Sequence, residues 1–140
     1  MVPSAVADAK ENMALNGVKN VQFYANKAED VIRDVINSLS KECDITVVVD
    51  PPRAGLHTSV IQALRYCTRL RRVIFVSCNL EAATHNFVEF ARPTSNRFRG
   101  SPFIPVFTKA VDLFPQTRHV EALILLERVP EASKQKEQKS

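Results

Sequence analysis

The chain has 140 residues, of which 45% are hydrophobic and 24% are charged, values typical of one globular domain. This composition argues against intrinsic disorder, and no apolar run approaches the roughly 20 residues that a membrane-spanning helix needs. The net charge of +4 favours a polyanionic partner only weakly.

Helical and strand patterns alternate along the chain. Apolar residues at helical spacing predict helices over residues 2–13, 31–39, 60–67 and 80–90, the first of them ending at Asn16-Gly17. Apolar runs predict strands over residues 21–24, 45–49, 73–76, 110–114 and 121–126. The β-branched run at 45–49 is typical of a strand covered on both faces. Residues 93–105 contain three prolines, and we expect them to be irregular.

Strands that alternate with helices predict a parallel, doubly wound α/β sheet. A short turn around Pro115 should reverse the chain, so that the last strand runs antiparallel to its neighbours. Residues 130–140 are rich in Lys, Glu, Gln and Ser, and we expect a disordered polar tail there. Ligands bind at the carboxyl ends of the strands in such sheets, so these ends are the places to search for chemistry.

The first strand-end motif is Asp-Pro-Pro-Arg-Ala-Gly-Leu at residues 50–56, directly after the strand at 45–49. A carboxylate at Asp50 can reach a ligand, while the two prolines stiffen the exit from the strand. An Asp-Pro pair alone is also a common turn that ends a strand.

The second motif is Ser77-Cys78-Asn79, at the junction between the strand at 73–76 and the next helix. The dipole at a helix N-terminus favours the thiolate form of a cysteine placed there. The alternative, an inert and half-buried cysteine, fits Cys43 and Cys67 better, because neither follows a strand.

The third motif covers residues 112–121, and its last residue opens an apolar strand. We expect Glu121 at the same edge of the sheet as Asp50 and Cys78. It either pairs with an arginine such as Arg118, or partial burial makes it a stronger base. His119 is a second candidate base, although a histidine in a turn is more often structural.

Cysteine and arginine usage bears on compartment and partners. The cysteines number three, an odd count without metal-ligand spacing, so we expect neither a disulfide framework nor a metal site. With no signal-peptide pattern at residues 1–4, an intracellular compartment, cytosolic or nuclear, is expected.

Two groups of arginines are either solvated helix ends or a surface for a polyanion: Arg65, Arg69, Arg71 and Arg72, and Arg92, Arg97 and Arg99.

Together, these three motifs resemble the RNA uracil-5-methyltransferases. The segments at 12–17 and 20–23 resemble that family's second helix and third strand, and the resemblance runs from about residue 5 to residue 128. It implies a Rossmann-like class I methyltransferase sheet, of which this chain supplies the carboxyl-terminal half with a final antiparallel strand.

The resemblance also implies an activity: S-adenosylmethionine-dependent methylation of uridine C5 in tRNA, giving 5-methyluridine in the T-loop. By resemblance, Cys78 is the nucleophile that adds to uracil C6, Glu121 is the base that removes the C5 proton, and Asp50 contacts the cofactor. Arginine-rich surface would hold the tRNA phosphates.

The chain departs from the family pattern in three features. The family's Asp-x-x-x-Gly-x-Gly cofactor turn and the acidic residue that grips the ribose have no counterpart in the sequence, and Leu80 replaces a frequent proline. We therefore expect residues 1–129 to be a partial methyltransferase domain, and the 140-residue chain alone to be inactive and to bind S-adenosylmethionine weakly.

Two other functions remain open. A non-catalytic RNA-binding fragment or pseudoenzyme would fit the lack of a cofactor turn. An amino-group methyltransferase would also use Asp-Pro-Pro, but such enzymes usually follow it with an aromatic residue. Arg53 in that place, together with Cys78, argues against this class.

Overall fold

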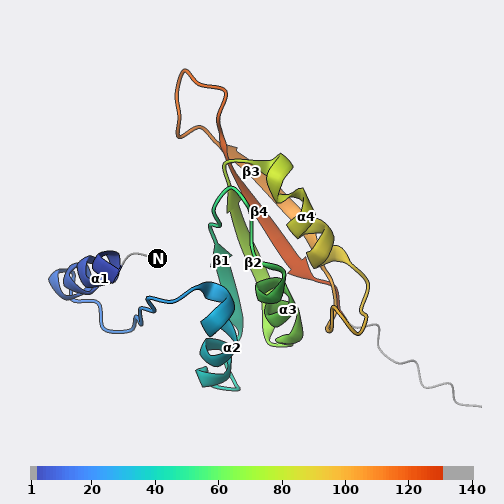
Figure 1. The fold of residues 1–140 in the computed structure, drawn as a ribbon, viewed down its shortest axis with the longest axis horizontal. Coiled ribbons are helices and arrows are strands. Elements are labelled where there is room, and N and C mark those ends of the chain that lie inside the picture. The colour runs from blue at the N-terminus through green and yellow to red at the C-terminus, as the bar shows by residue number, and fades with distance from the viewer. Residues whose placement is uncertain (1–2, 131–140) are drawn as a thin grey trace, which may run out of the picture. The chain divides into compact units, whose positions relative to one another are not determined.

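Helices and strands alternate over residues 28–111 of the computed structural model, which describes residues 3–130 (Figure 1). The chain divides into two units, Met1–Leu39 and Ser40–Ser140. Within residues 3–130, no helix is long and apolar enough to cross a membrane. Of the expected polar tail, residues 131–140 lie outside the described part of the chain.

The first unit holds helices α1 (Pro3–Leu15) and α2 (Ala28–Ser38), and both were predicted from apolar spacing. Helix α1 ends where Gly17 adopts a φ of +64°. The Gly17 N–H donates to Ala14 O at 3.1 Å and the Val18 N–H to Met13 O at 3.0 Å, which is the Schellman arrangement. The acidic residues Glu29 and Asp30 occupy the first turn of α2, where the helix dipole stabilises them.

The strand predicted over residues 21–24 is wrong, because residues 19–27 form neither helix nor strand. Strands need a hydrogen-bonded neighbour, and none is paired with this segment in the described part of the chain. Val21 and Tyr24 are accordingly exposed.

The second unit is a four-stranded sheet with two helices. Its strands are β1 (Ile45–Val49), β2 (Leu70–Ser77), β3 (Phe103–Val111) and β4 (Glu121–Arg128), in the order β1-β2-β4-β3. Strands β1 and β2 are parallel, and β4 runs antiparallel to both β2 and β3. The predicted α/β sheet with a final antiparallel strand is confirmed.

This topology gathers three chain segments at one edge of the sheet. Strands β1, β2 and β3 run in one direction, so their carboxyl ends lie together, and β4 begins at that edge. The register confirms it, since Ser77 pairs with Ala122 and Val111 pairs with Glu121. We call this edge the carboxyl end and the opposite edge the amino end.

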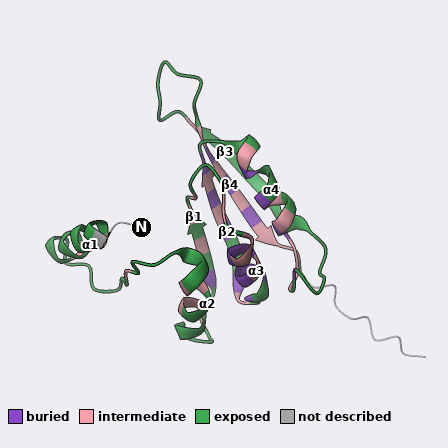
Figure 2. Ribbon diagram, viewed as in Figure 1, coloured by how far each residue is buried: buried purple, intermediate pink, exposed green. Residues whose placement is uncertain are grey.

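Helices α3 (Thr58–Tyr66) and α4 (Leu80–Ala91) follow β1 and β2 and pack on one face of the sheet (Figure 1). Buried positions alternate with less buried ones along β2 and β4 (Figure 2). Phe90 of α4 meets Phe103 of β3 edge-on, with 5.8 Å between ring centroids. The core of the unit includes the fully buried side chains Ile61, Leu64, Leu70, Val73, Phe75, Phe90, Phe103 and Leu126.

Strand β1 is not covered on both faces, contrary to the prediction from its β-branched run. Only Ile45 is buried, and Val48 is 65% exposed. Within the described part of the second unit, α3 and α4 lie on one face, so the other face of β1 has no layer over it there.

Strand β3 begins seven residues before the predicted start at residue 110 and ends at Val111 rather than 114. It pairs with β4 along its length, from Phe103 opposite Arg128 to Val111 opposite Glu121. The register is irregular between Pro105 and Phe107. An edge strand tolerates a proline at such an irregularity, which is why the proline-rich pattern concealed the strand.

At the amino end, Arg65 and Arg128 are built into the fold. Arg65 is fully buried, donating to the carbonyl oxygens of Glu89 at 3.0 Å and Gly100 at 2.8 Å. Desolvation by burial lowers the pKa of its guanidinium. The prediction that Arg65 is a solvated or polyanion-binding residue is therefore wrong. Arg128 donates to five backbone carbonyls, those of Leu64, Arg65, Cys67, Leu70 and Ser101.

The other arginines of the two groups are less buried. Arg72 pairs with Glu127 at 3.2 Å on the surface. The guanidinium groups of Arg92 and Arg97 lie over the ring of Phe98, at 5.9 and 5.4 Å from its centroid. Arg97 and Arg99 are both exposed, in the loop that precedes β3.

Candidate active site

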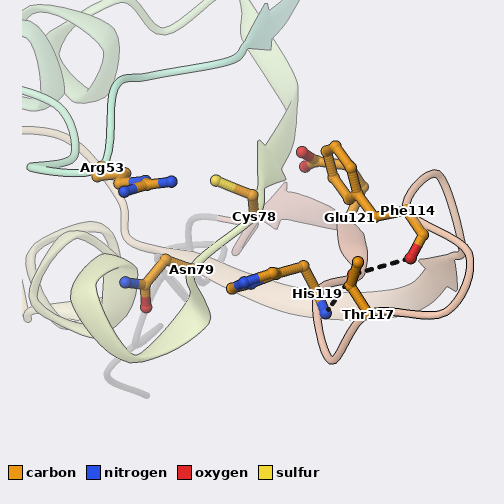
Figure 3. Close-up of a pocket in the computed structure, with 7 residues that line it drawn as sticks. All are labelled: Arg53, Cys78, Asn79, Phe114, Thr117, His119 and Glu121. Atoms are coloured by element: carbon orange, nitrogen blue, oxygen red, sulfur yellow. Dashed lines mark hydrogen bonds between the residues drawn. The ribbon is translucent and has the colours of Figure 1, made fainter.

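A pocket of about 560 Å³ opens at the carboxyl end of the sheet (Figure 3). Three segments form it: the loop after β1, the junction between β2 and α4, and the loop between β3 and β4 with the first residue of β4. The lining residues are Arg53, Cys78, Asn79, Phe114, Thr117, His119 and Glu121.

Cys78 lies between the last residue of β2 and the first turn of α4. Asn79 caps the helix, since its Oδ1 accepts from the Ala82 N–H at 3.1 Å, and its own N–H donates to Ser77 Oγ at 3.1 Å. These bonds fix the junction. The thiol of Cys78 is exposed and lines the pocket at a helix N-terminus, the arrangement expected for it.

The other two cysteines differ in place and surroundings. Cys67 is buried, and half-buried Cys43 donates to Ser40 O at 3.0 Å while accepting from Arg69 Nη1 at 3.7 Å. Both precede strands and so lie at the amino end. Of the cysteines, only Cys78 lines the described pocket.

Glu121 opens β4 as predicted and is partly buried. Its Oε2 is buried without a hydrogen-bond partner among the residues that the structure describes. No ion pair with Arg118 is found in that part of the chain, although the sequence left this pairing open. A buried carboxylate oxygen without a partner is costly, and because Glu121 lines the pocket this oxygen is available to a ligand there.

The loop between β3 and β4 is shaped by its own hydrogen bonds. Thr117 Oγ1 donates to Phe114 O at 2.8 Å and accepts from the His119 N–H at 3.2 Å (Figure 3). Gln116 takes a φ of +67°, in the left-handed region. This tight loop brings Phe114 and His119 into the pocket, so His119 remains a second candidate base.

From the Asp-Pro-Pro-Arg motif, the pocket receives Arg53 rather than Asp50. The guanidinium of Arg53 and the sulfur of Cys78 extend toward each other in Figure 3. The sequence reasoning missed Arg53 as a site residue and used it only to exclude a class of enzyme. The sequence signal was the Pro-Arg-Ala-Gly pattern of a four-residue turn, which the structure closes with a hydrogen bond from the Gly55 N–H to Pro52 O at 2.7 Å, with Arg53 and Ala54 at its two central positions.

Asp50 is exposed and lies at the carboxyl end of β1. It is free to accept hydrogen bonds from a ligand beside the pocket. The glycines in the described part are Gly17, which ends α1, Gly55 in the loop after β1, and Gly100 before β3, so none belongs to a Gly-x-Gly turn. The described residues can therefore provide one carboxylate contact to a nucleoside cofactor. They do not provide a glycine-rich turn that would bind it.

No group of three or more His, Cys, Asp or Glu residues within 3–130 could hold a metal ion. The chemistry available to this pocket is that of its side chains: a thiol, a carboxylate, a guanidinium and an imidazole.

A family model described as tRNA (Uracil-5-)-methyltransferase matches residues 1–129. Human tRNA (uracil-5-)-methyltransferase homolog A is 49% identical over 129 residues, which cover 92% of this chain and 20% of that protein. Homolog B of Danio rerio is 44% identical over 131 residues, covering 91% of this chain and 27% of its own length.

Among solved structures, the chain is similar to the crystal structure of Pyrococcus abyssi tRNA (uracil-54, C5)-methyltransferase in complex with S-adenosyl-L-homocysteine. The TM-score is 0.62 and the sequence identity 28%, over 87% of this chain and 25% of the other. The chain therefore spans about a fifth to a quarter of the length of the relatives that it matches.

Proposed function

The chain belongs to the tRNA (uracil-5-)-methyltransferase family, and we propose that its carboxyl-end pocket methylates C5 of uridine in tRNA. The family is one of enzymes, and the likeness to the Pyrococcus abyssi structure confirms the predicted class I methyltransferase sheet.

One observation carries the proposal. An exposed thiol at a helix N-terminus and a carboxylate with an unpartnered buried oxygen line the same pocket, although their residues are 43 positions apart. Methylation of uracil C5 needs a nucleophile and a base on one ring, because C5 alone is too weak a nucleophile.

In the proposed reaction, the Cys78 thiolate adds to uracil C6 and forms an S–C6 bond. The electron pair of the C5=C6 bond moves toward C5 and O4, so C5 becomes enolate-like. S-adenosylmethionine, when bound, would supply the methyl group that C5 takes up, and S-adenosylhomocysteine would be the leaving group. Glu121 then takes the C5 proton, and the electrons of the C5–H bond restore the C5=C6 double bond as the S–C6 bond breaks.

The other pocket residues would support these steps. Arg53 and the N-terminus of α4 both attract an anion, either the thiolate or the developing enolate oxygen. The ring of Phe114 offers a stacking surface for a base that has left its own stack. We assign a cofactor contact to Asp50.

A segment exchange tests the function. Residues 1–129 replace the matching segment of human homolog A, and methyl transfer to unmodified tRNA is measured with labelled S-adenosylmethionine. We expect methylated uridine C5 in the product, and none when the exchanged segment carries Cys78→Ala. A folded exchange protein that binds tRNA without methylating it would contradict the proposal and favour a non-catalytic RNA-binding role.

A further inference from the structure

The loop that carries Arg53 into the pocket is hydrogen-bonded to α4 through Leu56. The Leu56 N–H donates to Asn86 Oδ1 at 2.8 Å, and Asn86 Nδ2 donates to Leu56 O at 3.0 Å. Asn86 is fully buried, at 0% exposure. Because both functions of its amide are used on one loop residue, the loop has a single position along the helix.

Gly55 makes this close approach possible. Its φ is +79°, and a Cβ at this position would collide with Asn86 Oδ1. The same glycine closes the turn that contains Arg53, through its hydrogen bond to Pro52 O at 2.7 Å. The turn that presents Arg53 and the site that anchors the loop are therefore consecutive in the chain.

A second tie lies one helical turn further along α4. Thr58 Oγ1 donates to Glu89 Oε1 at 2.9 Å, so the helix binds both the end of the loop and the start of α3. At its other end, α4 begins at Leu80 and is capped by Asn79, the residue directly after Cys78. One helix thus fixes the nucleophile candidate and the arginine that faces it.

We propose that Asn86 is a positioning residue that holds the Arg53 guanidinium beside the Cys78 sulfur, where anionic groups form. The anchoring of the loop stands on the hydrogen bonds alone, whereas its consequence for catalysis rests on the proposed function. Asn86 lies outside the pocket lining and acts through Leu56 and Arg53.

A charge-selective alkylation of the 140-residue chain tests this role. The rates of Cys78 alkylation by iodoacetate, an anion, and by iodoacetamide, which is neutral, are measured by peptide mass spectrometry. Their ratio reports positive charge near the sulfur, because changes in thiol ionisation or exposure affect both rates alike. One unit charge about 6 Å away in water changes the ratio about threefold.

We expect Arg53→Gln to lower this ratio about threefold, and Asn86→Leu to lower it by a similar factor. In the Arg53→Gln background, Asn86→Leu should have no further effect. Hydrogen exchange at the Leu56 amide should accelerate about tenfold in Asn86→Leu, since a buried hydrogen bond is removed.

Phe90→Leu is the matched control, because it weakens the core on the same helix and leaves both hydrogen bonds between Asn86 and Leu56 in place. Its ratio should equal that of the unaltered chain. If Asn86→Leu does not fold, Asn86→Ala removes both hydrogen bonds to Leu56 without adding a charge near the sulfur.

Three results would overturn the proposal: an unchanged ratio in both Asn86 variants, a further fall in the Arg53→Gln background, or an equal fall in Phe90→Leu. The assay uses neither RNA nor S-adenosylmethionine. Its outcome is therefore independent of the methylation test, and the two proposals can fail separately.

Discussion

The two ends of the sheet hold the same residue types in opposite states. At the amino end, Arg65 and Arg128 donate to several backbone carbonyls, and Cys67 is buried. At the carboxyl end, Arg53 and Cys78 are exposed on either side of a pocket.

This difference indicates that the amino-end residues stabilise the fold, whereas the carboxyl-end residues are available for chemistry. A buried arginine that donates to several carbonyls joins strands, helices and loops, and its removal leaves those carbonyls without partners. A side chain that keeps its hydrogen-bonding capacity free at a strand end can act on a ligand instead. Residue type alone therefore does not distinguish the two roles, but the position relative to the strand direction does.

The largest effect is expected at the carboxyl end. In the segment-exchange protein, Glu121→Gln keeps the shape of the side chain but loses its basicity. Turnover should fall about 10²–10⁴-fold while the methylated covalent adduct accumulates. Single-turnover kinetics measure the rate of product release, and denaturing gels measure the amount of covalent adduct. Unchanged turnover would return Glu121 to a structural role, and His119→Gln would then be the variant to measure.

At the amino end, Arg128→Met should destabilise the fold by about 3 kcal/mol, because five carbonyls lose a donor. The matched control is Arg72→Met, which removes an exposed ion pair with Glu127 and should cost about 0–1 kcal/mol. Urea denaturation of the 140-residue chain measures both. Equal destabilisation would mean that the amino-end arginine network contributes no more than surface charge.

The affinity of the carboxyl end for the cofactor is the next quantity to measure. The described residues offer Asp50 and no glycine cradle, so the 140-residue chain should bind S-adenosylmethionine weakly. Calorimetric titration is the measurement, with Asp50→Asn as the control. A dissociation constant in the low micromolar range, about −8 kcal/mol, would show that these residues suffice.

The smallest effect concerns Arg97 and Arg99, which are exposed at the amino end. Replacing both with glutamine should weaken tRNA binding and flatten its salt dependence, by about one unit of slope for each phosphate that the protein no longer neutralises. Filter binding of the segment-exchange protein across salt concentrations measures this. An unaltered slope would assign both arginines to solvent.

Local patterns predicted most of the fold. The helices and the strands β1, β2 and β4 followed from apolar spacing, which places the less exposed side chains of each element on one stripe or face. Strand β3 was misplaced because its stability comes from pairing with β4, and no local pattern reports such pairing. The segment at 21–24 has strand-forming residues but no described partner, so propensity alone misled there.

For the site, sequence order and strand direction predicted the edge at which Cys78 and Glu121 meet. The position of Arg53 in the pocket depends on a loop that is hydrogen-bonded to Asn86. Asn86 is 33 residues after Arg53 in the chain. Such an interaction is long-range and carries no local signal. The same reason explains why Arg65 and Arg128 could not be separated from the exposed arginines by sequence.

The central claim is that covalent chemistry belongs to the carboxyl end and to Cys78. The direct measurement is to incubate the segment-exchange protein with S-adenosylmethionine and tRNA that contains 5-fluorouridine, whose fluorine blocks proton removal, and to map the trapped adduct by peptide mass spectrometry. The account predicts an adduct on the peptide that contains Cys78, retained in Cys43→Ala and Cys67→Ala and abolished in Cys78→Ala. An adduct that persists in Cys78→Ala, or that maps to either cysteine of the amino end, would contradict it.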